Sequence, residues 1–258
     1  VGGGGSVRIE SGMSAPFQEL FPGVAFPPPS VVIQSPDAAV ESGQIEMHTG
    51  HGASSGSFSI TTGDAEETHS GDVNIMTGQG TSGVGAIVIK AGTTREGKGL
   101  ASAGGEVSIE SGDSNTGPGG SVQINAGSSY SLKTGGAGGS ISMKAGHSES
   151  KDDDGGSITI VGGNSLNEGG HVSIASGGSS DATSGNVDVT SSSGVNTGAV
   201  SFGSGEAQQT SGAISFTSGR STELSSGDIN FETGSAVEAA GAVSLKGGVG
   251  QQLGGSID

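Results

Sequence analysis

The chain has 258 residues, of which 54 are glycine, none is cysteine or tryptophan, and only 30% are hydrophobic. This composition excludes a thick core of large side chains, disulfide bonds and thiolate metal sites. The formal net charge of -17 at pH 7 comes from 26 acidic and 9 basic residues. It leaves no Lys/Arg footprint for nucleic acid or for an anionic membrane surface.

The first residues, VGGGGSVRIE, already follow the pattern that fills most of the chain, and they carry neither an initiating Met nor a signal peptide. The last residues, GGSID, stop inside the same pattern. Because solenoids usually carry atypical terminal repeats, we expect ends that stack on neighbours, or a window on a longer array. No run approaches the ~18 apolar residues of a membrane span, so no membrane insertion is predicted.

The segment 13–29 departs from the pattern and is rich in proline and phenylalanine. We predict an apolar insertion that either covers the open edge or side of the molecule itself or contacts a neighbouring subunit. Exposed aromatic patches usually mark such contacts. The candidate interface residues are Phe17, Leu20, Phe21, Phe26, Pro27, Pro28 and Pro29.

One unit recurs seventeen times along the chain, mostly in steps of about 13–15 residues, and reads G-x-V-x-I-x-[STAG]-G. We call the first apolar residue of each unit its anchor and the apolar residue two positions later its second apolar position. Alternation between glycines is typical of a short strand with one buried face, and the glycines suggest corners with backbone conformations closed to other residues. The anchors are Val7, Val31, Ile45, Phe58, Val73, Ile87, Val107, Val122, Ile141, Ile158, Val172, Val187, Val200, Ile214, Ile229, Val243 and Ile257.

This repeat predicts an all-β fold, a two-sheeted parallel β-solenoid (β-helix) that forms a single domain over residues 1–258. The shortest units have too few residues left after the strand to return to its start, so two units are expected in each coil. The predicted geometry is about 14–15 residues per strand-turn unit and about 29 per coil.

Few residues suggest chemistry, so no catalytic or cofactor-binding residue is predicted. Asp152, Asp153 and Asp154 form the best acidic cluster and are a weak candidate for Ca²⁺, which prefers hard oxygen ligands. A metal cluster at His48 and His51 is disfavoured, because the histidines are scattered over turns and outward positions. The others are His69, His147 and His171.

Two further classes of function fit the repeat less well. A carbohydrate-active β-helix enzyme needs paired carboxylates on adjacent coils, and Glu46, Asp188 and Glu232 do not form such a pair by register. Ice binding needs ordered threonine rows, whereas the outward central positions here are mixed and partly charged, as at Arg8 and Glu46.

The unit and its Ser-, Gly- and Asp-rich arcs, as in GDSNTGPGGSVQINAG, resemble the Gly/Ser-rich short-repeat β-solenoids of secreted fibre, adhesin and cell-surface proteins of microalgal or bacterial style. The resemblance covers nearly the whole chain except residues 13–29 and implies a structural or adhesive role outside the cell. We therefore expect a non-enzymatic extracellular protein whose rods assemble into a filament, appendage or matrix. Its partners would be further copies or neighbouring subunits. The alternative is an adhesin that binds glycans, mineral or ice.

Overall fold

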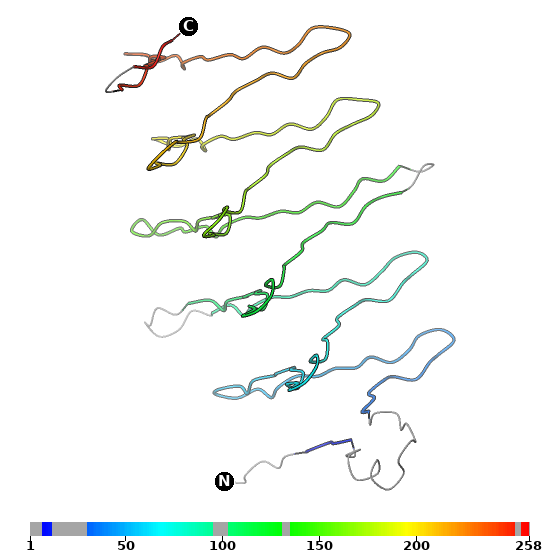
Figure 1. Ribbon diagram of the computed structural model, residues 1–258. Helices are drawn as coiled ribbons and strands as arrows, with labels where there is room; N and C mark the ends of the chain where they lie inside the picture. Colours follow the sequence, from blue (N-terminus) through cyan, green and yellow to red (C-terminus); the bar gives the residue numbers. More distant parts are fainter. Residues whose placement is uncertain (1–6, 12–29, 95–102, 131–134, 251–253, 258) are drawn as a thin grey trace. The chain divides into compact units, whose positions relative to one another are not determined.

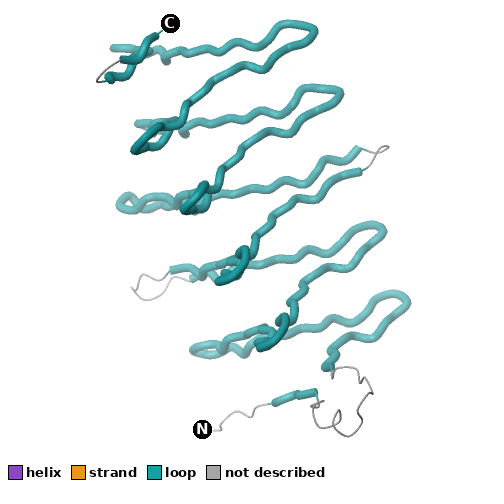
Figure 2. Tube along the Cα trace, viewed as in Figure 1, coloured by secondary structure: helices purple, strands orange, loops and turns teal. Residues whose placement is uncertain are grey.

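The computed structural model describes residues 7–11, 30–94, 103–130, 135–250 and 254–257, and Figure 1 shows extended stretches joined by narrow loops. None of these residues lies in a helix or a strand, as Figure 2 shows. The predicted β-solenoid is therefore wrong: the described chain is extended and irregular. The chain divides into two parts, Val1–Ile124 and Asn125–Asp258.

No residue of the described ranges is buried, so these ranges form no hydrophobic core. The chain exposes 26320 Å² to solvent. A compact monomer of this mass would expose about 10,000 Å² and a fully unfolded chain about 36,000 Å². The surface area thus agrees with an extended chain and contradicts the two packed sheets.

The physical reason lies in how little apolar surface each unit carries. A unit has only two large apolar side chains at its strand positions, and most of its other residues are glycine, serine or threonine. Glycine loses more conformational freedom than any other residue when it is ordered. Within the structure, this cost is not offset by burial of the anchors or by a ladder of backbone hydrogen bonds among the described residues.

The segments between glycines nevertheless keep two distinct sides. Side chains two residues apart bond to each other, which requires locally extended backbone with alternating sides. Ser108 Oγ donates a 3.1 Å hydrogen bond to the Glu110 carboxylate. The same spacing recurs in the bond from Gln44 Nε2 to Glu46, at 3.5 Å, and in the ion pair of Arg8 with Glu10.

Several of the loops that join consecutive segments are closed at their ends by a pair of glycines. The glycine that ends one segment accepts, through its carbonyl, a hydrogen bond from the N–H of the glycine that begins the next. We call this pair a neck. The described residues contain seven backbone-bonded necks, with N···O distances of 2.8–3.0 Å: Gly92/Gly105, Gly112/Gly120, Gly127/Gly139, Gly146/Gly156, Gly163/Gly170, Gly177/Gly185 and Gly248/Gly255.

The glycines at the necks are needed for close approach of the backbone and not for unusual dihedral angles. In the described ranges only Gly135 has a positive φ, of 68°, and it lies inside a loop. The expectation of corner conformations closed to other residues is therefore wrong at the necks. A Cβ added to Gly170 would instead lie 3.0 Å from the backbone nitrogen of Gly163, tighter than most real Cβ contacts, so the neighbouring backbone would have to shift.

The loops themselves are organised by serine. A serine hydroxyl accepts a backbone N–H two or three residues later, a local bond that favours turns over helix or sheet. Ser114 does so for Gly117, at 2.9 Å, and Ser165 for Asn167, at 3.1 Å. The serine-rich composition of the loops thus has a local structural cause.

Candidate functional site

The feature that repeats along the whole described chain is a row of apolar side chains, which we call the apolar row. It consists of the anchors and the second apolar positions. From Val31 to Val243 the anchors are 47–58% exposed, and from Ile33 to Leu245 the second apolar positions are 59–74% exposed. Apolar side chains in the loops, such as Leu166 and Val195, are fully exposed. The structure therefore shields the apolar row partly, on one side of each segment.

Neighbouring segments can direct the apolar row toward the same side. Phe202 and Phe216 occupy the second apolar positions of two consecutive units. Their rings meet edge to face, with centroids 6.5 Å apart and an interplanar angle of 84°. Such a pair contributes about 0.5–1.5 kcal/mol beyond simple burial. Across this loop, the two segments present one shared apolar surface.

Side-chain hydroxyls add hydrogen bonds at the ends of the segments that carry the apolar row. At Gly112/Gly120 the hydroxyl of Ser111 adds a 3.1 Å hydrogen bond to the carbonyl of Gly120. At the loop that begins at Gly50, Ser55 Oγ donates to the Gly50 carbonyl at 3.0 Å and also bonds the Thr49 hydroxyl, at 2.9 Å. A serine or threonine directly before the first glycine of a loop is small enough to lie beside the opposite glycine. Its hydroxyl can also form a hydrogen bond across the end of the loop.

The predicted calcium candidate is an exposed loop. Asp152, Asp153 and Asp154 are all exposed, and the backbone N–H of Asp152 donates to Ser150 Oγ at 3.2 Å. Within the described part of the chain, no three His, Asp or Glu side chains are placed to hold one metal ion. The structure thus does not gather these three carboxylates around a common point.

The other candidate residues are likewise dispersed. The histidines are exposed, and His48 Nδ1 lies 3.4 Å from the carbonyl oxygen of its own neighbour Thr49. Glu46 belongs to the first part of the chain, and Asp188 and Glu232 belong to the second. Each of these carboxylates is exposed to solvent.

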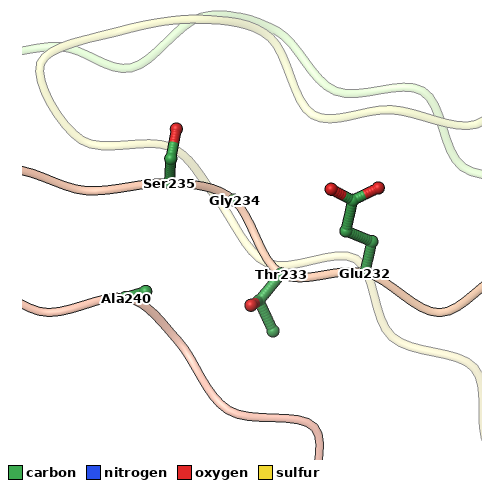
Figure 3. Close-up of a pocket in the computed structure, with 5 residues that line it drawn as sticks. All are labelled: Glu232, Thr233, Gly234, Ser235 and Ala240. Carbon is green, nitrogen blue, oxygen red and sulfur yellow. The ribbon is translucent and has the colours of Figure 1, made fainter.

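One open hollow of about 470 Å³ lies beside a single turn and is lined by Glu232, Thr233, Gly234, Ser235 and Ala240. Figure 3 shows the Glu232 carboxylate and the Thr233 side chain pointing to opposite sides of the chain. Its lining includes one carboxylate and two hydroxyls, and no histidine, lysine or second carboxylate. Its geometry does not match the converging groups that catalysis needs.

The interface candidates of the insertion, from Phe17 to Pro29, lie outside the described residues. Sequence reasoning missed the necks. Their signal was present in the printed sequence: a glycine begins nearly every segment, and the residue before the closing glycine is always Ser, Thr, Ala or Gly. In the structure this small residue faces the next glycine, as Ala145 does at 3.4 Å from a Cβ built on Gly156.

Comparison of the chain with protein-family models, with curated proteins and with solved structures finds no match. The resemblance to short-repeat surface proteins therefore remains an expectation from repeat style. Among the residues that the structure describes, no helix is long and apolar enough to cross a membrane.

Proposed function

We propose that this chain is an extracellular structural protein whose copies associate into a filament, appendage or matrix. The observation that carries the proposal is the apolar row, which recurs in the units from Val31 to Val243 and stays about half to three-quarters exposed on a chain with a formal net charge of -17. Exposed apolar surface of this extent usually marks a contact with another molecule. A role in catalysis is not part of the proposal.

Repetition strengthens a contact of this kind. One pair of half-exposed side chains gains little on association, but many equal contacts on one chain act together once the first has formed. A second copy offers the same row with the same spacing between its anchors. Assembly by repeated weak contacts is how the chain would serve a structural purpose without a folded core.

The test removes part of the apolar row and compares the result with an equal loss elsewhere. We expect replacement of Val122, Ile141, Ile158 and Val172 by serine to raise the concentration at which the chain sediments as an assembly by more than about tenfold, equivalent to about 1.4 kcal/mol. The control replaces four fully exposed loop residues by serine, and these are Leu166, Val195, Val237 and Val249.

The control chain should assemble like the original. If both variants assemble alike, the apolar row is not the contact surface. If the original chain stays monomeric at every accessible concentration, the structural role itself fails. The location outside the cell is tested separately, by gold-labelled antibodies against the chain on intact cells of its source.

A further inference from the structure

We infer that the copies associate by pairing the backbones of their extended segments, so that each segment forms an intermolecular β-strand with the same segment of a second copy. This inference rests on the proposed function and adds the partner and the mode of contact. The backbone decides between the two modes of contact, because side chains alone do not distinguish strand pairing from a loose apolar contact.

The backbone of the segments is free to pair. Among the described units from Val31 to Val243, no N–H or C=O group between the two glycines of a segment bonds another described backbone group; the backbone bonds are those of the necks. Every such residue is at the surface or partly exposed, so a second backbone can reach these groups and satisfy them. An extended edge of this kind is a template for another strand.

The segments also have the composition of intermolecular strands. SVQINA at 121–126 carries β-branched residues at alternate positions, SITIVG at 157–162 carries four in succession, and neither contains a charge or a proline. Short segments with high β propensity and low net charge are those that stack in cross-β assemblies. The side-chain bonds two residues apart, as from Ser108 to Glu110, indicate that the segments are already extended before any partner arrives.

The necks keep the loop residues away from the backbone that would pair with a second copy. Each neck draws the ends of a loop together, so the loop residues leave the line of the segments and the next segment begins directly beside the end of the last. The glycines leave the backbone bare at this point, with no Cβ between Gly163 and Gly170, whose N···O distance is 2.9 Å. The seven bonded necks thus bring together the segments on either side of their loops.

A second copy is favoured over an unrelated strand because of the spacing. Segments recur at irregular steps: Phe58 follows Ile45 after a short loop, whereas Val107 follows Ile87 only after a long one. A partner that pairs with many segments must have the same order of steps, and an identical chain has this order by definition. In-register pairing also places each apolar row against its own copy, which allows identical side chains to stack.

The experiment uses the full chain in its assembled state. We expect aligned assemblies to give a reflection at about 4.7–4.8 Å, the spacing between paired strands. Copies with ¹³C-labelled backbone carbonyls are mixed with unlabelled copies before assembly. If strands pair between copies, the labelled amide I band shifts as the unlabelled fraction rises, whereas pairing within one chain gives no such shift.

A variant removes the N–H groups without touching the apolar row. Proline replaces the central outward residue of five consecutive units, and the matched control carries alanine at the same positions, which are Ser108, Gln123, Ser142, Thr159 and Ser173. Proline cannot donate to a ladder. We expect the proline chain to lose the reflection and the dilution shift from these units, and the alanine chain to keep both.

The outcomes separate the two proposals. Assemblies of the original chain that lack the reflection and the dilution shift overturn the strand pairing and leave the structural function standing. A proline chain that keeps the full dilution shift overturns pairing by these five segments. If the original chain forms no assembly, both the proposed function and this inference fail.

Discussion

At the scale of single residues, the two glycines of a neck are not equivalent. A Cβ built on Gly163 meets nothing within 4 Å, whereas one on Gly170 meets the Gly163 nitrogen at 3.0 Å. The same asymmetry occurs at Gly146 and Gly156, where the second glycine again has the close contact, at 3.1 Å. In these two necks, a side chain on the glycine that begins the segment would be crowded by the opposite backbone, and a side chain on the glycine that ends the previous segment would not.

We therefore predict opposite results for two alanine substitutions in one neck. Gly170→Ala forces the new methyl group against the Gly163 backbone, so the hydrogen bond from residue 170 to the Gly163 carbonyl opens. In the original chain this bond, at about 0.5–1.5 kcal/mol, should slow amide exchange of residue 170 by roughly two- to tenfold. NMR-detected hydrogen exchange should show this protection lost in the variant.

The control is Gly163→Ala, which lies across the same bond. Both substitutions lower the conformational freedom of the disordered chain by a similar amount, so a difference between them reports the contact. Equal protection in the two variants would show that close approach is not why glycine begins the segments.

At the scale of the repeated unit, loop length varies, whereas the geometry of the seven bonded necks does not. Backbone-bonded necks close loops as different as Gly163/Gly170 and Gly127/Gly139 with nearly the same N···O distance, 2.9 and 2.8 Å. Loop closure entropy grows only with the logarithm of loop length. Length variation between units is thus compatible with one way of joining segments.

This argument predicts that a loop can be lengthened without opening its neck. Insertion of eight Gly/Ser residues between Asn115 and Thr116 roughly doubles the loop closed by Gly112 and Gly120, which costs only about 0.6 kcal/mol. The amide of Gly120 should therefore lose less than about threefold of its exchange protection. Complete loss of protection would mean that specific loop contacts, such as Ser114 with Gly117, close the neck.

The sequence alone indicated extended segments with two sides, but the strands and the solenoid predicted from it are wrong for the described residues. The two-residue alternation agrees with side chains that lie on two sides of a segment, as the bond from Ser108 to Glu110 indicates. It did not show whether two such sides bury one another, because alternation reports local geometry and not the free energy of packing. Two apolar side chains per unit, in a chain with 54 glycines, are too few for that step within the structure.

The necks could have been predicted in part. The sequence shows the paired glycines and the small residue beside them. The hydrogen bond, however, joins two glycines whose separation in sequence varies from loop to loop. A pattern search at fixed spacing does not detect such a pair. The calcium candidate failed to gain support for a related reason: adjacency of Asp152, Asp153 and Asp154 in sequence does not make their carboxylates converge in an extended loop.

At the scale of the whole molecule, the chain combines an extensive apolar row with strong net charge. Each copy carries a formal charge of -17, so two copies repel each other while their apolar rows attract. The loops hold much of this charge, as Asp152 to Asp154 illustrate, and the centres of several segments hold none. The balance between the two forces depends on the ionic strength of the medium.

We predict that salt promotes assembly. Raising NaCl from about 0.01 to about 0.15 M shortens the Debye length from about 30 to about 8 Å, and the concentration at which assembly begins should fall. Light scattering against protein concentration measures this onset. A variant with asparagine at positions 152, 153 and 154 carries three fewer negative charges, so its onset should depend less on salt. An onset that rises with salt would contradict electrostatic control of association.

The necks also bear on how the chain would respond to force. From Gly163 to Gly170 the chain makes seven peptide steps, yet a single hydrogen bond holds the two ends together. When tension breaks that bond, about 20 Å of stored length is released, at up to about 3.3–3.6 Å per residue. A chain with several such loops would lengthen in small, reversible increments, and each loop would absorb work before any covalent bond is loaded. Stretchability is thus a property of how the glycines pair.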